Sequence, residues 1–155
     1  AASEVYDPVT DTWQYIAVAR GTLNHTVTLL KDGKVLMAGG FGKEPLPMRT
    51  ELYDPVADVW SRMGEMNASR TYHTATLLED GRVLAVGGSS TGPQASAEIY
   101  DPATGVWSPA GEMAVVRSMH TAMLLRDGRV LVVGGDDNST EIFDPSTGAW
   151  TSSGS

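Results

Sequence analysis

Short apolar runs alternate with polar turns along the whole chain, and the most regular runs come in pairs. In one copy, residues 73–78 and 82–88 are rich in Leu, Val, Ala and Thr, and Asp80-Gly81 lies between them. Asp-Gly between two such runs is a strong β-hairpin signal, because it supports the positive φ angles of a type I′ turn. We therefore predict a hairpin of two strands, A and B, with that turn. The same dipeptide recurs at Asp32-Gly33 and Asp127-Gly128.

Two further strands, C and D, are predicted after each hairpin. Residues 97–100 form a short β-rich run, and a second run surrounds Trp107. Between them, Asp101-Pro-Ala-Thr-Gly105 has Pro where a turn fixes φ and Gly where left-handed backbone is favoured. Asp11 and Asp58 replace that Gly in the first two copies, and Asp tolerates the same conformation. The pattern predicts a four-stranded antiparallel meander.

The meander is an internal repeat. The string Glu-x-Tyr/Phe-Asp-Pro occurs four times, and each copy has a Trp nine residues after its Glu. A second string, His-Thr followed by Leu-Leu-x-Asp-Gly-Lys/Arg-Val-Leu and Gly-Gly, occurs three times. Strand B is apolar on both faces, so its sheet must be covered on both sides. Four-stranded sheets that repeat at about 45 residues and pack face to face are β-propeller blades.

The order of three features within each repeat resembles the kelch repeat. They are the Gly-Gly pair that ends strand B, the Tyr of strand C and the Trp of strand D, as in Gly87-Gly88, Tyr100 and Trp107. The amino-acid sequence of strands A and B is most similar to that of bacterial kelch repeats and of the repeats in the propeller of galactose oxidase. The resemblance covers essentially the whole chain and implies an all-β fold of kelch β-propeller blades. It says little about function, because propellers host many activities.

The repeat count predicts one kelch propeller arc over residues 1–155. A half blade at about 1–15 precedes three complete blades at about 23–62, 71–109 and 118–152. Three blades cannot close a ring, and the resemblance implies six or seven. The chain could be a fragment of a larger propeller, or two copies could form a homodimer that completes six blades. The surplus half blade favours the fragment, and we expect an isolated chain to self-associate.

Composition excludes several function classes. The net charge of −8 argues against nucleic acid and anionic membrane as partners, since both attract positive surfaces. The absence of Cys excludes disulfides, thiolate metal sites and cysteine nucleophiles. No apolar run is long enough to span a membrane, and no signal peptide is evident. The compartment is not determined, although an extracellular or periplasmic location is slightly favoured over a cytoplasmic one.

Two groups of residues could bind metal. His25, His73 and His120 are quasi-equivalent, so propeller symmetry could gather them into a three-His site. We expect instead that each His begins strand A and caps nearby backbone. Asp136-Asp137-Asn138 could bind Ca²⁺ through clustered oxygens, but a solvated tight loop is the commoner explanation. We therefore expect no metal and no cofactor.

No catalytic pattern was found. Gly-x-Ser-x-Gly, the Walker loop and His-Glu-x-x-His are all absent from the sequence. Galactose-oxidase-like enzymes need a Cys–Tyr cross-link, which a chain without Cys cannot form. We predict a noncatalytic kelch scaffold for protein–protein interaction. The alternative is a portion of a galactose-oxidase-like or carbohydrate-active extracellular propeller.

Charged residues at fixed places in the repeat predict buried ion pairs. Arg70 and Arg117 stand three residues before a His, and a Glu opens each strand C. A partly buried guanidinium favours a bidentate carboxylate, so we expect an Arg–Glu network that supports the blades rather than binding a ligand. The first copy has Thr22 at the Arg position, with Arg20 displaced, so the pair should be weaker there.

The B–C loops vary most between copies, whereas the A–B and C–D turns are short and nearly identical. Recognition usually resides in variable loops on a uniform scaffold. We therefore predict that the end of the blades with the B–C and D–A connections carries an interaction face. Its candidate polar members are Lys43, Arg49, Arg70, Gln94, Arg117 and Asp136.

Overall fold

The computed structural model describes residues 3–16, 23–42, 48–135 and 137–154, and all regular structure within them is β-strand. The strands are β1 (Ser3–Asp7), β2 (Thr12–Ile16), β3 (Thr26–Leu29), β4 (Val35–Ala38), β5 (Thr50–Asp54), β6 (Val59–Arg62), β7 (Thr74–Leu77), β8 (Val83–Val86), β9 (Gln94–Asp101), β10 (Val106–Arg117), β11 (Thr121–Leu124), β12 (Val130–Val133), β13 (Thr140–Asp144) and β14 (Ala149–Ser152). The predicted all-β fold is confirmed.

The strands form four antiparallel sheets in chain order. A two-stranded half blade, β1–β2, is followed by blade 1 (β3–β6), blade 2 (β7–β10) and blade 3 (β11–β14). Each complete blade is the predicted meander, with strand A at one edge and strand D at the other. In blade 2 the fourth strand is longer than the sequence pattern indicated, because β10 continues through two bulges to Arg117.

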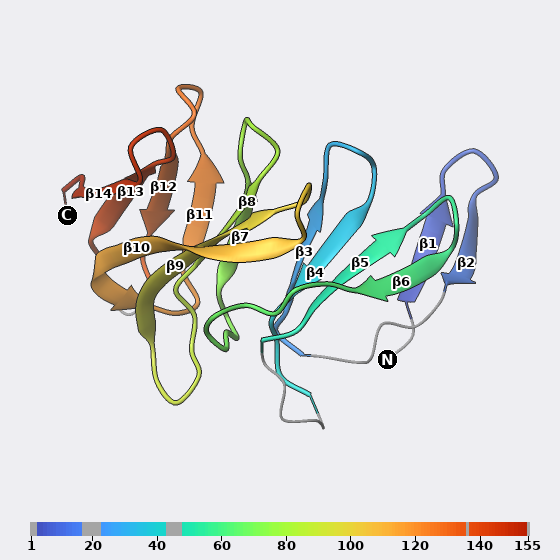
Figure 1. The fold of residues 1–155 in the computed structure, drawn as a ribbon, viewed down its shortest axis with the longest axis horizontal. Coiled ribbons are helices and arrows are strands. Elements are labelled where there is room, and N and C mark those ends of the chain that lie inside the picture. Colours follow the sequence, from blue (N-terminus) through green and yellow to red (C-terminus); the bar gives the residue numbers. More distant parts are fainter. Residues whose placement is uncertain (1–2, 17–22, 43–47, 136, 155) are drawn as a thin grey trace.

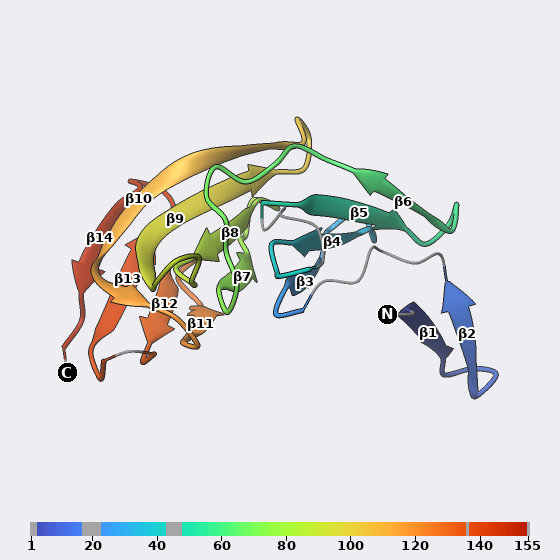
Figure 2. The same ribbon diagram turned by 90° about the horizontal axis from the view of Figure 1, so that it is seen from below.

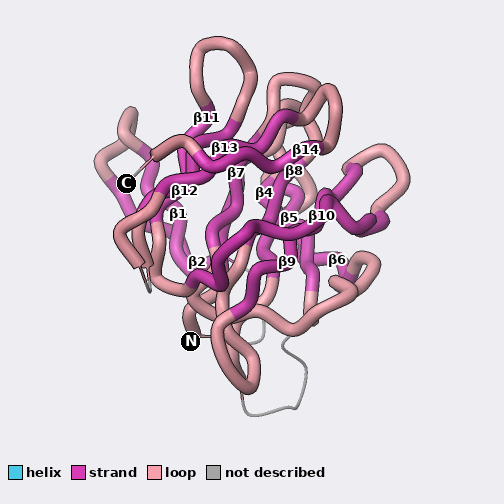
Figure 3. Tube along the Cα trace, turned by 90° about the vertical axis from the view of Figure 1, so that its left-hand side faces the viewer, coloured by secondary structure: helices cyan, strands magenta, loops and turns pink. Residues whose placement is uncertain are grey.

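The blades are arranged around an arc (Figures 1 and 2). The strands A, which are β3, β7 and β11, lie on its inner, concave side, and the strands D lie on its outer side (Figure 2). The half blade lies beyond blade 1 at one end, and blade 3 is at the other end. From the blade 3 end, the sheets lie one behind another, and loops project at both ends of the blades (Figure 3).

The predicted type I′ turns between strands A and B are wrong. In all three turns the Gly has a positive φ, from 83° to 92°, but none of the preceding Asp residues does. In the first turn Gly33 N–H donates to Leu30 O, and Leu30 N–H donates to Lys34 O. This pattern is a type I turn followed by a left-handed Gly, which closes a hairpin with a longer loop. The Asp instead accepts a backbone bond, as Asp32 does from Lys34.

The turns between strands C and D confirm the prediction for Asp. Asp11 and Asp58 have φ values of 54° and 52°, at the positions where Gly105 and Gly148 have 72° and 71°. Each Asp also accepts a hydrogen bond from the Tyr of its own strand C, at 2.8 Å for Tyr6 and 2.9 Å for Tyr53. This bond compensates for a backbone conformation that few residues other than Gly adopt.

The hydrophobic core lies between blades rather than within them. Val83, Leu84, Ala85 and Val86 of β8 are all completely buried. Val83 and Ala85 face blade 1, whereas Leu84 and Val86 face blade 3, so both sides of the sheet are covered as predicted. Full burial of one Val or Leu side chain stabilises a fold by about 1.5–3 kcal/mol. A blade without a neighbour loses this contribution on one side.

The aromatic residues of strands C and D form one repeated pair in each sheet. The ring centroids are 5.0–5.2 Å apart and the rings are tilted by 34–45°. Phe143 has the same geometry with Trp150 as Tyr100 has with Trp107, so the ring is the shared requirement, as predicted. Tyr100 and Trp107 are buried against Leu36 and Ala38 of blade 1. In blades 2 and 3 the pair therefore packs the blade against the preceding one.

The first Gly of each Gly-Gly pair makes room for the following blade. A Cβ on Gly39 would lie 2.5 Å from Arg70 O and 2.7 Å from the His73 ring, and one on Gly87 would lie 2.5 Å from Arg117 O. Gly134 is the equivalent position in blade 3, and a Cβ there would meet no atom of the described residues within 4 Å. All three have positive φ, so Gly134 differs only in lacking a neighbour.

This contrast predicts different costs for two otherwise matched substitutions. Gly134→Ala should lower the free energy of unfolding by about 1 kcal/mol, the cost of left-handed backbone for Ala. Gly87→Ala should lower it by about 1–3 kcal/mol more, because the added Cβ overpacks against Arg117 O. Urea unfolding followed by tryptophan fluorescence measures both values. Equal losses in the two variants would show that the blade contact is not what requires Gly87.

Candidate functional site

A buried ion pair joins the linker before blade 2 to the third strand of that blade. Arg70 Nε and Nη2 lie 3.1 and 3.0 Å from Glu98 Oε1, and Arg70 Nη1 donates to Gly87 O and Ser96 O, both at 2.7 Å. The Arg70 side chain is completely buried, and that of Glu98 nearly so. Burial lowers the pKa of Arg70, while the Glu98 carboxylate opposes that fall. The guanidinium stays protonated, because its ordinary pKa is far above neutrality.

The same pair also fixes the linker between blades. Glu98 accepts the backbone N–H of Asn67 at 2.6 Å and of Ala68 at 3.1 Å. The Arg70 carbonyl accepts the N–H of Gly40, which belongs to blade 1, at 2.8 Å. One residue therefore holds its own blade through its side chain and the preceding blade through its backbone. We call the Arg70–Glu98 pair with these contacts the blade anchor.

Blade 3 has the same anchor. Arg117 Nη2 lies 3.2 Å from Glu141 Oε1, and Arg117 Nη1 donates to Gly134 O at 2.8 Å and to Ser139 O at 3.0 Å. The Arg117 carbonyl accepts the N–H of Gly88 in blade 2 at 2.8 Å. The predicted structural Arg–Glu network is therefore confirmed in blades 2 and 3.

Blade 1 forms its pair with a different arginine. Arg49, from the B–C loop, places Nε 2.8 Å from Glu51 Oε1, and both side chains are largely buried. Thr22 and Arg20, on which the prediction of a weaker pair rested, lie outside the described residues. Sequence reasoning did not identify Arg49 as the partner, because the positions two residues before Glu98 and Glu141 hold Ser, so Arg49 has no counterpart in the other copies.

The two buried histidines bond across blade boundaries. His73 Nε2 lies 3.0 Å from Thr26 Oγ1 of blade 1, and His120 Nε2 lies 2.9 Å from Thr74 Oγ1 of blade 2. Burial, together with the nearby charge of Arg70, lowers the pKa of His73 to about 3, so the ring is neutral near pH 7. In the described part of the chain no three His, Cys, Asp or Glu side chains are grouped so that they could hold a metal ion. The histidines thus serve blade packing rather than a shared three-His cluster.

The acidic loop after β12 is only partly described, because Asp136 lies outside the described residues. Asp137 Oδ1 lies 3.5 Å from Arg117 Nη1 and accepts the Ser139 N–H. These bonds to Ser139, and then the charge of Arg117, lower the pKa of Asp137. Its carboxylate is therefore partly compensated by groups of its own blade, which weakens the case for Ca²⁺.

The structure places the candidate interaction residues in several environments. Arg70 and Arg117 are completely buried in blade anchors, so neither offers a free guanidinium at the surface. Gln94 is half-buried and donates to Ser69 O at 2.7 Å. Arg49 is paired as described above, and Lys43 and Asp136 lie outside the described residues. The interaction face stays a prediction. Arg70 and Arg117 are not part of its surface, because both are buried and hold the blades beneath it.

Sequence reasoning missed three residues with left-handed backbone at this end of the blades. Asn24, Tyr72 and Met119 have φ values of 57°, 55° and 54°, and each directly precedes the His that leads into strand A. Their side chains are exposed, 41% for Tyr72 and 71% for Met119. Tyr72 N–H donates to Asn24 O and Met119 N–H donates to Tyr72 O, so they form an inner rim from blade to blade. The sequence did contain one signal for these residues, because the position before each His differs between copies while the residues after it are nearly constant.

Other exposed apolar side chains lie beside the inner rim. Leu23 and Phe41 form a bridge between the linker before β3 and the loop after β4, and they are 66% and 63% exposed. Isolated exposed apolar residues are common, but several on one end of a scaffold are typical of interaction sites. This end therefore has apolar groups that the candidate polar list did not include.

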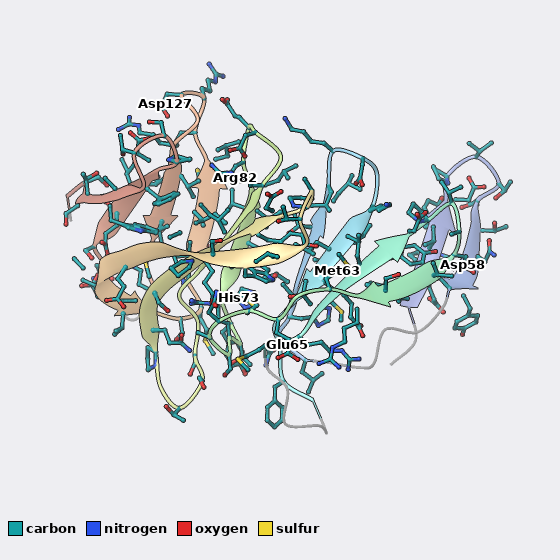
Figure 4. The ribbon with its side chains drawn as sticks, in the orientation of Figure 1. Asp58, Met63, Glu65, His73, Arg82 and Asp127 are labelled. Carbon is teal, nitrogen blue, oxygen red and sulfur yellow. The ribbon has the colours of Figure 1, made fainter. Side chains whose placement is uncertain are left out.

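The opposite end, with the A–B and C–D turns, has two shallow grooves between blades. One, of about 450 Å³, lies between blades 2 and 3, and an equivalent of about 310 Å³ lies between blades 1 and 2. Their charged side chains are mostly paired locally, as Arg82 is with Asp80 and Arg129 with Asp127, both at 2.7 Å. Figure 4 shows Arg82 and Asp127 towards this end and His73 towards the other. Pairs this exposed contribute little to stability or specificity.

Part of the chain matches a known protein family. The family model described as Kelch motif matches residues 70–114. The matched residues include most of blade 2, which is therefore similar to a kelch repeat. No curated protein matches the chain. The predicted kelch-type fold is confirmed, whereas the closer similarity to bacterial kelch repeats stays a prediction.

A solved structure supports the same fold. It is a fungal alcohol oxidase of the AA5 family, in complex with copper. The match has a TM-score of 0.74 at 19% sequence identity, and it covers 90% of this chain but only 32% of the oxidase chain. The chain thus spans about a third of that protein. No helix in the described residues is long and apolar enough to cross a membrane.

The blade anchor predicts a large effect for one arginine and a small effect for another. Arg70→Met should lower the free energy of unfolding by about 3–5 kcal/mol, because it leaves Glu98 buried without its partner. The matched control, Arg82→Met, removes an exposed pair with Asp80 and should cost no more than about 1 kcal/mol. Chemical unfolding measures both. A loss at Arg70 as small as that at Arg82 would contradict a structural role for the anchor.

The low pKa of His73 predicts a loss of stability in mild acid. Below its ordinary pKa of 6.5 the unfolded chain binds a proton that the folded chain excludes down to about pH 3. Between these values the free energy of unfolding should fall by up to about 1.4 kcal/mol per pH unit from this group. His73→Gln, which keeps a polar group near Thr26, should flatten that dependence by about one proton. Urea titrations from neutral pH into mild acid test this, and identical slopes in both proteins would refute it.

Proposed function

We propose that the chain is part of a noncatalytic kelch scaffold for protein–protein interaction, with its recognition surface at the end that carries the B–C and D–A connections. The observation that carries the proposal is the inner rim, where Asn24, Tyr72 and Met119 share one backbone conformation but have different, exposed side chains. Variation on a constant frame is the arrangement by which repeat proteins usually vary their partners.

The interior supports this proposal because its charged side chains form hydrogen bonds and ion pairs with groups of the protein itself. The buried guanidinium groups of Arg70 and Arg117 bind a carboxylate and two carbonyls each. The His73 and His120 rings each contact a Thr of the preceding blade. A catalytic acid, base or nucleophile must be reachable by a substrate, and these groups are not.

We further propose that the arc belongs to a larger propeller. Blade 3 and the half blade each leave one side without a neighbouring sheet (Figure 2). A homodimer that completes six blades is the other arrangement, but the half blade occupies the sector beside blade 1 where the second copy would have to dock. Native mass spectrometry separates the two possibilities, because the second requires a dimer mass.

A second candidate function comes from the fold neighbour. The matched structure is an alcohol oxidase in complex with copper, so the arc could be the propeller portion of an oxidase. This chain has no Cys, and its described residues hold no group of three His, Cys, Asp or Glu side chains that could bind a metal ion. Oxygen consumption by the full-length natural protein, loaded with Cu²⁺ and given primary alcohols, tests this candidate. Turnover would contradict the noncatalytic proposal.

The recognition surface predicts where a partner cross-links. A photoreactive phenylalanine analogue in place of Tyr72 should cross-link a partner protein, because Tyr72 lies on the inner rim and is exposed. The matched control is the same analogue in place of Val56, which is 96% exposed in a C–D turn at the other end. With the purified partner, Tyr72→Ala should then weaken binding about tenfold or more, as for an aromatic hot spot.

Two results would count against this assignment. One is equal cross-linking from both positions, which would indicate nonspecific capture. The other is unchanged affinity in Tyr72→Ala and Met119→Ala, because the inner rim would then not be the contact surface.

A further inference from the structure

A pocket of about 280 Å³ lies beside the fourth strand of blade 2, next to the linker that leads into the blade. Asn67 and Ala68 line it from the linker, Ser96 from β9, and Pro109 and Glu112 from β10. We call it the linker pocket. Blade 2 has a complete blade on each side, so the surroundings of the pocket are those of an inner blade of the arc (Figure 2).

A bulge in β10 shapes the linker pocket. Between the register pairs Pro109–Glu98 and Glu112–Ser96, β10 has two residues where β9 has one. An extra residue of this kind bends the strand and redirects its side chains. Glu112 follows the bulge directly, and it is exposed and lines the pocket.

The blade anchor also lines the pocket, but its charges are already compensated. All three nitrogens of the buried Arg70 guanidinium donate to Glu98, to Ser96 or to Gly87 O. No N–H group of Arg70 is therefore left for an anion, and Glu98 balances its positive charge. The net charge of the pocket comes from Glu112, so the pocket favours a cation.

Glu112 lacks the partner that its counterpart in blade 1 has. The counterpart is Glu65, whose Oε1 is paired with Arg62 Nη2. Pro109 takes the position of Arg62 in blade 2, since both lie opposite the Glu of strand C. Glu112 forms no ion pair or hydrogen bond with the other described residues. Figure 4 shows Glu65 towards the same end of the blades as His73, which is the end with the B–C and D–A connections.

Asn67 offers a second oxygen at the pocket. Its Nδ2 group donates to Glu98 Oε2 at 2.7 Å and to Trp107 O at 3.4 Å, whereas its Oδ1 accepts no bond from the described residues. Blade 3 has Ala114 at this position, so the amide is particular to blade 2. A guanidinium group has five N–H donors in one plane and can bond a carboxylate and an amide oxygen together, whereas an ammonium group is a compact point charge.

We propose that the linker pocket binds an arginine side chain of a protein partner, which takes the place that Arg62 has beside Glu65 in blade 1. The guanidinium pairs with Glu112 and donates to Asn67 Oδ1, and its aliphatic stem lies along Pro109. The inference names one contact at the recognition end, so it rests on the proposed scaffold function. It does not depend on the inner rim.

A capped arginine tests the proposal on the intact chain. The probe is N-acetyl-L-arginine N-methylamide, added at millimolar concentration to ¹⁵N-labelled protein. The amide signals of Gly111 and Glu112 should shift and saturate, while those of Gly64 and Glu65 should not, because Arg62 already pairs with Glu65. The citrulline analogue of the probe has the same shape without the charge, and it should bind about tenfold more weakly.

Matched protein variants locate the site. Glu112→Gln removes the charge and should weaken binding of the probe about tenfold, whereas Glu65→Gln should leave it unchanged. Pro109→Arg gives Glu112 a partner from its own chain, as in blade 1, and should abolish the shifts. The folded amide spectrum of each variant confirms that loss of binding is not loss of structure.

Three results would overturn the proposal. They are no saturable shift at Glu112, equal binding of the arginine and citrulline probes, and unchanged binding to Pro109→Arg. Tighter binding of free L-arginine than of the capped probe would indicate a small-molecule site, contrary to the protein partner proposed. Cross-linking from Tyr72 tests the inner rim and alcohol oxidation tests the scaffold proposal, so each proposal fails separately from this one.

Discussion

A buried charge must keep all its partners, and this requirement determines how the blades are joined. Removing an arginine and a glutamate from water costs several kcal/mol for each ion, which only close pairing and further hydrogen bonds offset. Arg70 meets the requirement with one carboxylate and two carbonyls, and Glu98 with two backbone amides of the linker. The linker cannot move without leaving one of these groups unsatisfied. The fixed linker holds the Arg70 carbonyl where it accepts the N–H of Gly40 in the preceding blade.

The packing between blades follows from the position of that carbonyl. Because Arg70 O and the His73 ring press against Gly39, no side chain is possible there, and the positive φ of the Gly is required as well. The buried His73 ring makes a polar contact across the boundary with Thr26. The anchor, the Gly-Gly pair and the His–Thr bond are thus parts of one interface. They recur together at the boundary between blades 1 and 2 and at the boundary between blades 2 and 3.

Features decided within one repeat could be predicted from sequence, and features that depend on a neighbouring segment could not. The four-stranded meander, the left-handed Asp58 and the Arg–Glu pairs follow from local pattern, turn chemistry and charge. The type I′ turn was wrong because Asp-Gly also suits a type I turn whose Asp caps the backbone. The Arg49–Glu51 pair lies within one blade but was missed because the other copies have Ser at the position of Arg49. The left-handed Tyr72 depends on its bond to Asn24 of the preceding blade, which one repeat does not specify.

Duplication explains why the interior of this protein is a poor place for a specific function. Residues that every blade needs for packing cannot also differ between blades, so the buried Arg, Glu and His positions are constrained to one role. Side chains can vary only where the repeated backbone is fixed but its surroundings are open. Tyr72 and Met119 fulfil both conditions, since backbone bonds between blades hold them while their side chains face outward. Under the proposed scaffold function, such positions and the loops beside them are where this arc differs from another built on the same repeat.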